Sequence, residues 1–229
     1  MSKILALDTT QAACSVALLC DDQIIEASVQ IPRQHTKQIL PLVDKVLSEA
    51  GVVLNQVDAI SFGRGPGSFT GLRIACGITQ GLAFSADLPV IPVSSLAALA
   101  VASFEAEPSA DCCFASFDAR MGQVYGAFYQ KAALPQLLGE EFVIEPESVL
   151  IPDYSGELFA VGSGATFIEQ MPDKLQQQTK KIDVSLEAFA KHLLPIAEAD
   201  LAAGCLVSAE DAEPSYVRQQ VTWKKINQQ

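Results

Sequence analysis

Apolar and polar positions alternate along the first hundred residues in blocks that predict an α/β fold. The runs ILALD, SVALL and IIEASV predict strands before residue 30, the first two forming a hairpin. Helical spacing predicts a helix over 36–50 and another over 70–86, with the strand VDAISFG between them. The strand PVIPV and the apolar helix SSLAALAVASF follow. Such alternation is typical of a sheet that contains parallel strands and carries helices on its faces.

Two segments look like copies of one strand-turn-strand motif. Each is an apolar strand that ends in Asp, then a turn, then an alternating strand: ILALDTTQAACSVALL and CCFASFDARMGQVYGAFY. Asp8 and Asp118 hold the same place in the two copies, which predicts a duplicated fold; two unrelated hairpins are the alternative. The polar segment EAEPSAD marks the predicted boundary between an N-terminal lobe, 1–104, and a C-terminal lobe, 105–229.

Composition and charge narrow the function. The chain has 229 residues, and its hydrophobic share of 49% is enough for a large core. The net charge is −12, and most of the acidic excess follows residue 104. Such a surface repels phosphate backbones, so tight unaided binding of RNA is not expected. The less charged first half is better suited to burial against a partner.

The cysteines and the apolar runs indicate the cellular compartment of the protein. Six cysteines contain no C-x-x-C pair, which favours reduced thiols over a disulfide framework or a zinc site. The apolar run before Asp8 is only four residues long, which is too short for a signal-peptide core. The longest uncharged stretch, 88–104, falls short of a membrane span. We expect a cytoplasmic protein without a membrane contact.

The segment GRGPGSFTGLR places four glycines between a predicted strand and a predicted helix, as loops that hold phosphate do. However, the lysine of a Walker A loop is absent, and Ser68 and Thr70 replace the third glycine of a dinucleotide fingerprint. The alternative is a tight turn in which glycines supply positive φ and Ser68 or Thr70 caps the helix. A nucleophilic Ser68 would need a base, and the G-x-S-x-G elbow is absent.

The two predicted helices around this loop carry unusual faces. Gly77 and Gly81 lie on one face of the second helix, where each costs about 1 kcal/mol relative to alanine. The first helix has an apolar stripe wider than one core contact requires. We predict that both helices contact a partner; burial of both within one lobe is the alternative. The candidate residues are Ile39, Leu42, Val43, Val46, Ala75, Gly77, Ile78 and Gly81.

Cofactor and metal sites are not expected. In actin-like and sugar-kinase folds, two hairpins like these hold nucleotide phosphates, with glycine after the Asp. Here Thr9 follows Asp8 and Ala119 follows Asp118, so the two aspartates are vestigial candidates only. The two histidines, His35 and His192, lie too far apart to form a metal site and are assigned to the surface or the core.

Seven segments together resemble the TsaB (YeaZ) family of bacterial proteins. They are ILALDTTQAACSVAL, HTKQILPLVDKVL, GRGPGSFTGLRIACGITQGLA, PVIPVSSLAALA, FDARMGQVYGA, VGSGA and PSYVR. The resemblance covers essentially the whole chain and implies an actin-like, duplicated two-lobe fold of the sugar kinase, Hsp70 and actin superfamily. It also implies a non-catalytic role in forming N6-threonylcarbamoyladenosine (t6A) in tRNA, at the adenosine 3′ of the anticodon.

The same resemblance implies partners and the loss of catalysis. The partners are the paralogous transferase TsaD and the ATPase TsaE, with pairing through the N-terminal lobe as a homodimer alone or a heterodimer with TsaD. Transfer RNA is reached only through the complex. The metal-binding H-x-x-x-H of TsaD matches Ser95 and Leu99, which implies an inactive paralogue. Two alternatives stay open, an actin-like ATPase or kinase using Asp8 and Asp118 and a glycoprotease-type peptidase using Ser68.

Overall fold

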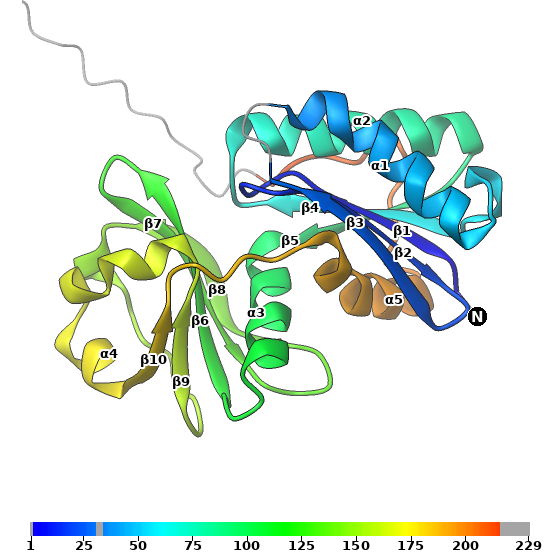
Figure 1. Ribbon diagram of the computed structural model, residues 1–229. Helices are drawn as coiled ribbons and strands as arrows, with labels where there is room; N and C mark the ends of the chain where they lie inside the picture. Colours follow the sequence, from blue (N-terminus) through cyan, green and yellow to red (C-terminus); the bar gives the residue numbers. More distant parts are fainter. Residues whose placement is uncertain (1, 31–33, 216–229) are drawn as a thin grey trace, which may run out of the picture.

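The computed structural model describes residues 2–30 and 34–215 and contains two five-stranded sheets (Figure 1). The first sheet has the order β3-β2-β1-β4-β5 and the second β10-β9-β6-β7-β8. In each sheet, three consecutive strands pair antiparallel, a later strand pairs in parallel with the first of the three, and a fifth strand pairs in parallel with that later strand. The predicted duplicated α/β fold is therefore confirmed.

The first sheet is built from the N-terminal part of the chain. Its strands are β1 (Ile4–Asp8), β2 (Cys14–Cys20), β3 (Gln23–Val29), β4 (Ala59–Gly65) and β5 (Val90–Ser94). Its helices are α1 (His35–Ala50), α2 (Phe69–Ala86), α3 (Ser95–Ala106) and, from the end of the chain, α5 (Leu194–Ala203). The predicted strands and helices of this region are all present.

The second sheet comprises β6 (Cys112–Arg120), β7 (Gln123–Gln130), β8 (Gln136–Ile144), β9 (Leu158–Val161) and β10 (Thr179–Asp183), with the short helix α4 (Asp173–Gln178). We did not predict β8 or β10. Both are edge strands with many exposed positions, so they lack the apolar alternation of a half-buried strand. The helix predicted around SLEAFAKHLLPIAEADLAAG is confined to α5, preceded by the 3₁₀ helix η4 (Ala190–Leu193).

Two helical layers cover the first sheet, and one of them joins it to the second. Helices α1 and α2 pack on one face, where Ile39, Val46 and Ala75 enter an apolar core with Phe62. Helices α3 and α5 lie on the other face (Figure 1). There Leu99 of α3 shares a second core with residues of both sheets, including Ile91 and Phe117. Residue 104, the predicted boundary, lies within α3, and the division into lobes at that point stays a prediction.

The glycine loop is a strand-to-helix turn, as the alternative interpretation held. Ser68 caps α2, because its hydroxyl accepts the Gly71 amide at 3.3 Å. Of the four glycines, Gly65 alone has a positive φ, 102°. The prediction that the glycines of this loop supply positive φ is therefore wrong for Gly63, Gly67 and Gly71. A Cβ on Gly67 would come within 2.6 Å of the Thr10 carbonyl oxygen, so glycine is needed for close approach to the β1–β2 turn.

Residues 205–215, which we name the C-terminal strap, run back across the first sheet. Val207 pairs antiparallel with Val90 at the edge of β5. The Cys76 thiol and the Gln80 amide of α2 both donate to the Ala212 carbonyl, at 3.1 and 3.0 Å. The Ser215 amide donates to the carbonyl of Arg64. The segment PSYVR passes out of the described residues after Ser215.

The cysteines behave as the sequence predicts for core residues. All six are free, and Cys112 and Cys113 are fully buried in β6. Burial raises the pKa of each of these two thiols to about 12. They are therefore protonated and unreactive at neutral pH. Within the described ranges, no helix combines the length and the apolar character that crossing a membrane requires.

Substituting Gly71 by Ala should destabilise the protein. A Cβ there would overlap the carbonyl oxygen of Thr9, so the hairpin or α2 must shift, at a cost of about 2 kcal/mol or more. The matched control is Gly77→Ala in the same helix, where a Cβ meets nothing within 4 Å and stability should rise by up to about 1 kcal/mol. Thermal unfolding measures both; equal melting temperatures would contradict the close-approach role of Gly71.

Candidate functional site

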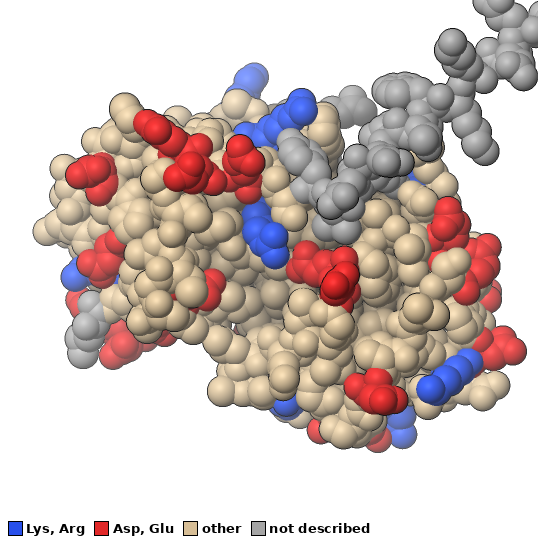
Figure 2. Space-filling model, turned by 180° about the vertical axis from the view of Figure 1, so that it is seen from behind, with Lys and Arg blue, Asp and Glu red and all other residues tan. Residues whose placement is uncertain are grey.

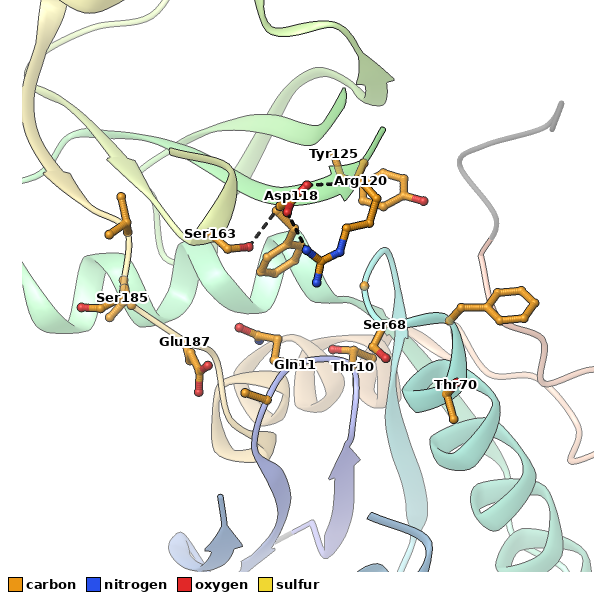
Figure 3. A pocket seen from close by; sticks show the side chains of 17 residues that line it. Thr10, Gln11, Ser68, Thr70, Asp118, Arg120, Tyr125, Ser163, Ser185 and Glu187 are labelled. Carbon is orange, nitrogen blue, oxygen red and sulfur yellow. Dashed lines mark hydrogen bonds and ion pairs between the residues drawn. The ribbon is translucent and has the colours of Figure 1, made fainter. Parts of the chain in front are cut away.

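A cleft of about 830 Å³ lies between the hairpin β1–β2 and the hairpin β6–β7. In Figure 3, Thr10 and Ser68 lie on one wall, and Asp118 and Arg120 on the facing wall. The linker after β10, including Glu187, closes one end. The walls are rich in hydroxyl groups, contributed by Thr10, Ser68, Thr70, Tyr125, Ser163 and Ser185.

The first hairpin buries its aspartate. Asp8 ends β1 and is only 2% exposed, and its Oδ1 accepts both the amide of Thr10 at 2.6 Å and its hydroxyl at 2.7 Å. The other oxygen, Oδ2, is buried without a hydrogen-bond partner among the described residues. Burial raises the pKa of Asp8 to about 6, although the two bonds from Thr10 oppose this rise. The carboxyl group therefore lies under the turn and not in the cleft.

The second hairpin repeats this geometry in a more exposed setting. Oδ1 of Asp118 accepts the amide of Arg120 at 2.7 Å, the same i to i+2 bond that Asp8 makes with Thr10. Oδ2 of Asp118 is 3.1 Å from the Arg120 guanidinium, and the Asp118 amide donates to the Ser163 hydroxyl. The two aspartates thus occupy equivalent positions, as predicted.

The hairpins do not fit a nucleotide. An actin-like turn offers free backbone N–H groups to phosphate, but here Asp8 already binds the Thr10 amide and Asp118 the Arg120 amide. The Thr9 hydroxyl donates to the Gly71 carbonyl at 2.6 Å, which holds the first turn against α2. The first turn is therefore fixed by its own side chains and by the start of α2.

Ser95 and Leu99, which the resemblance matches to metal ligands of TsaD, both make internal contacts. The Ser95 hydroxyl is buried and donates to the hydroxyl of Thr10 at 3.1 Å. Leu99 is fully buried, and its Cδ2 occupies the space beside Gly162 that a Cβ would need. Across residues 2–30 and 34–215, no three His, Cys, Asp or Glu side chains converge as metal ligands.

Ser68 does not have the surroundings of a nucleophile. Its hydroxyl accepts the Gly71 amide as a helix cap. The Nε2 atom of His35 lies 3.1 Å from the Ala12 carbonyl, and Nδ1 of His192 accepts the amide of Phe189. His192 is buried, which lowers its pKa and keeps the ring neutral. Both histidines therefore have structural partners, as their assignment to surface or core predicts.

The candidate partner residues on α1 and α2 separate into two groups. Five of them are buried in the core of the chain: Ile39, Leu42, Val43, Val46 and Ala75. The apolar stripe of α1 is therefore covered by the first sheet, and these side chains are not available to a partner. Gly77 and Gly81 are exposed on α2, and Ile78 is half-buried. Exposed Phe69 and Phe84 lie at the two ends of the same helix.

Sequence reasoning missed one polar cluster. Glu141 of β8 accepts hydrogen bonds from Ser94 and Tyr129 and lies near Arg64. These residues are far apart in the sequence and belong to no motif, and β8 itself was not predicted. No signal in a single sequence would have brought them together.

Replacing Asp8 by Asn should change how stability depends on pH. The pKa of Asp8 is about 6 in the folded chain and 3.8 when unperturbed. The protonated carboxyl group therefore contributes fully to the free energy of unfolding below pH 3.8, and this contribution is lost as the pH rises through 6. The asparagine carbonyl can accept both bonds from Thr10 without ionising. The variant should therefore gain about 3 kcal/mol relative to wild type between pH 4 and 7.5.

Urea unfolding at both pH values measures this gain, with the exposed Asp44→Asn as control. An equal difference between variant and wild type at the two pH values would show that the Asp8 pKa is not raised.

Comparisons with known proteins agree with this architecture. The profile of the family described as TsaD, tRNA N6-adenosine threonylcarbamoyltransferase, matches residues 28–214. The tRNA threonylcarbamoyladenosine biosynthesis protein TsaB of Haemophilus influenzae is 41% identical over 97% of this chain and 96% of that protein. The protein of the same name from Escherichia coli is 42% identical over 98% of both.

A solved structure, YeaZ from Pseudomonas aeruginosa, superposes with a TM-score of 0.89 at 45% identity. The match covers 94% of this chain and 100% of that one. The actin-like fold that the sequence resemblance implies is confirmed. The chain belongs to the family of the tRNA threonylcarbamoyladenosine biosynthesis protein TsaB.

Proposed function

We propose that this chain is a non-catalytic subunit in the synthesis of t6A in tRNA, where it pairs with the transferase TsaD. The observation that carries the proposal is the identity of 41% and 42%, over nearly the full length, to two proteins named for this biosynthesis. It would support or activate TsaD, and TsaE would engage the surface that the pair forms.

The cleft residues support the absence of catalysis. Asp8 is buried under its own hairpin, and the Asp118 carboxylate is held by Arg120. Ser95 and Leu99 stand where the transferase carries its metal ligands, and both are committed to internal contacts. These internal contacts support a cleft without a catalytic role.

The surface charge supports an indirect role toward tRNA. The net charge is −12, and the face shown in Figure 2 carries scattered Lys and Arg among more numerous Asp and Glu, without a continuous basic patch. Phosphate contacts require Lys and Arg in a cluster. The tRNA would therefore be held mainly by the partners, and the complex would act in the cytoplasm.

The exposed side of α2 is the surface that we propose for pairing. Arg73 stacks over the Phe69 ring at 3.8 Å, and Phe84 is 74% exposed at the other end. Between them, Gly77 and Gly81 have open space where side chains would stand. Two aromatic rings flanking a glycine groove suit the close approach of another helix. The same surface would serve a homodimer of the chain alone and a heterodimer with TsaD.

Omitting this chain from a reconstituted reaction tests the function. With TsaD, TsaE, the adenylate-forming synthase and tRNA, t6A formation should fall at least about tenfold without the chain. Unchanged product would contradict the proposal.

Asp118→Asn should leave the product unchanged, since the cleft performs no chemistry. Micromolar binding of ATP to the isolated chain, lost in Asp118→Asn, would instead favour the ATPase alternative.

A side chain placed in the glycine groove tests the pairing surface. Gly81→Leu should weaken binding to TsaD roughly 100-fold, because leucine fills the groove, while the helix itself gains up to about 1 kcal/mol. The matched control is Ala202→Leu, exposed on α5 at the opposite face of the first sheet. Calorimetry measures affinity and thermal unfolding measures stability. Wild-type affinity in Gly81→Leu would exclude this surface. The double substitution Val43→Glu and Val46→Glu cannot test a pairing surface, because both side chains lie in the core of the chain.

A further inference from the structure

A carboxylate of the second sheet reaches across to the first sheet. Glu141 lies in the edge strand β8, and its side chain is only 13% exposed. Its Oε1 accepts a hydrogen bond from the Ser94 hydroxyl and a second from the Tyr129 hydroxyl at 3.3 Å. Its Oε2 lies 3.9 Å from the guanidinium of Arg64. Of these three partners, Tyr129 belongs to the second sheet, and Ser94 and Arg64 to the first.

The two first-sheet partners of Glu141 each make a further contact within the first part of the chain. The Ser94 hydroxyl caps α3 by accepting the amides of Leu96 and Ala97 while it donates to Glu141. Arg64 is the residue before Gly65 at the start of the glycine loop, and its carbonyl accepts the Ser215 amide of the C-terminal strap. One carboxylate therefore contacts the residue that caps α3 and a residue of the glycine loop.

Other polar contacts hold the hairpin β1–β2 to the linker after β10. The Gln11 amide donates to the Ala188 carbonyl at 3.1 Å and accepts the Ala188 amide at 3.3 Å. The Ser15 hydroxyl accepts the amide of Ala190 at 2.9 Å. These bonds join the hairpin to the segment that leads back to the first sheet, whereas the Glu141 cluster joins the two sheets directly. Two-lobed proteins commonly close around a ligand, but here side chains make the closing contacts.

The cluster depends on the Glu141 carboxylate as its hydrogen-bond acceptor. Tyr129 is 2% exposed and its pKa is raised well above the usual value, by burial first and by the nearby Glu141 next, so it stays a neutral donor. If the carboxylate is removed, the buried Tyr129 hydroxyl is left without this acceptor and Arg64 without its counter-charge. Because these partners come from both sheets, the loss would act on the position of one sheet relative to the other.

We propose that Glu141 is a positioning residue, which fixes the opening of the cleft by tying β8 of the second sheet to Arg64 and Ser94 of the first. The tie keeps α2 in one orientation relative to the second sheet without a bound ligand. A partner that contacts both parts of the chain then meets a single preformed surface, and binding loses less conformational freedom. The role in the t6A reaction rests on the proposed function, whereas the tie itself does not.

Hydrogen exchange of the full chain tests the tie. In Glu141→Ala, the amides of Leu96 and Ala97 and those of β8 should exchange at least about tenfold faster than in wild type, because the cluster opens more often. Glu140→Ala is the matched control, since Glu140 is the preceding residue of the strand and is exposed. Glu141→Gln should restore most of the protection, because its carbonyl can accept from Ser94 and Tyr129. Unchanged exchange in Glu141→Ala would overturn the proposal.

The reconstituted reaction tests positioning. Glu141→Ala should bind TsaD at least about threefold more weakly than wild type, because the partner no longer meets a preformed surface, and should form t6A correspondingly more slowly when TsaD is limiting. Wild-type rates despite faster exchange would overturn the positioning role. If Glu141→Ala does not fold, Tyr129→Phe and Arg64→Gln, which each remove one contact, must both accelerate exchange, and failure to do so overturns the tie. If wild-type chain itself does not stimulate the reaction, the proposed function fails and exchange alone decides the tie.

Discussion

The close contact between the β1–β2 turn and the start of α2 organises this protein. The Ser68 amide donates to the Thr10 carbonyl at 2.8 Å, and the Thr9 hydroxyl donates to the Gly71 carbonyl. Glycine is required at Gly67 and Gly71 because the two backbones meet without room for a Cβ. This one contact sets the direction of α2.

The two sheets share a topology but differ in what their hairpins can do. Asp8 is sealed under the first turn, whereas Asp118 keeps part of its carboxylate exposed beside Arg120. The packing also differs, since α2 lies over the first turn, whereas the 3₁₀ helix η3 (Ser163–Gln170) lies beside the second and its Ser163 hydroxyl accepts the Asp118 amide. A duplicated fold therefore preserves backbone geometry more faithfully than it preserves the chemistry of matching residues.

Local patterns predicted the parts of the fold that local forces determine. The hairpins, α1, α2 and the equivalence of Asp8 and Asp118 follow from strand alternation, helical spacing and repeated turns. The edge strands β8 and β10 and the Glu141 cluster depend on contacts between distant segments, which no spacing records. The wide stripe of α1 predicted a partner contact at Val43 and Val46, but the first sheet buries both. Periodicity shows that a face is covered and not what covers it.

The C-terminal strap has a consequence for how the chain is made. Val90 lies in the last strand of the first sheet, and its pairing partner Val207 belongs to a segment that is synthesised only after the whole second sheet. During synthesis, the β5 edge must wait unpaired while later strands emerge and fold. Edges of this kind attract other strands. The order of translation therefore leaves the first sheet, although started first, to be completed last.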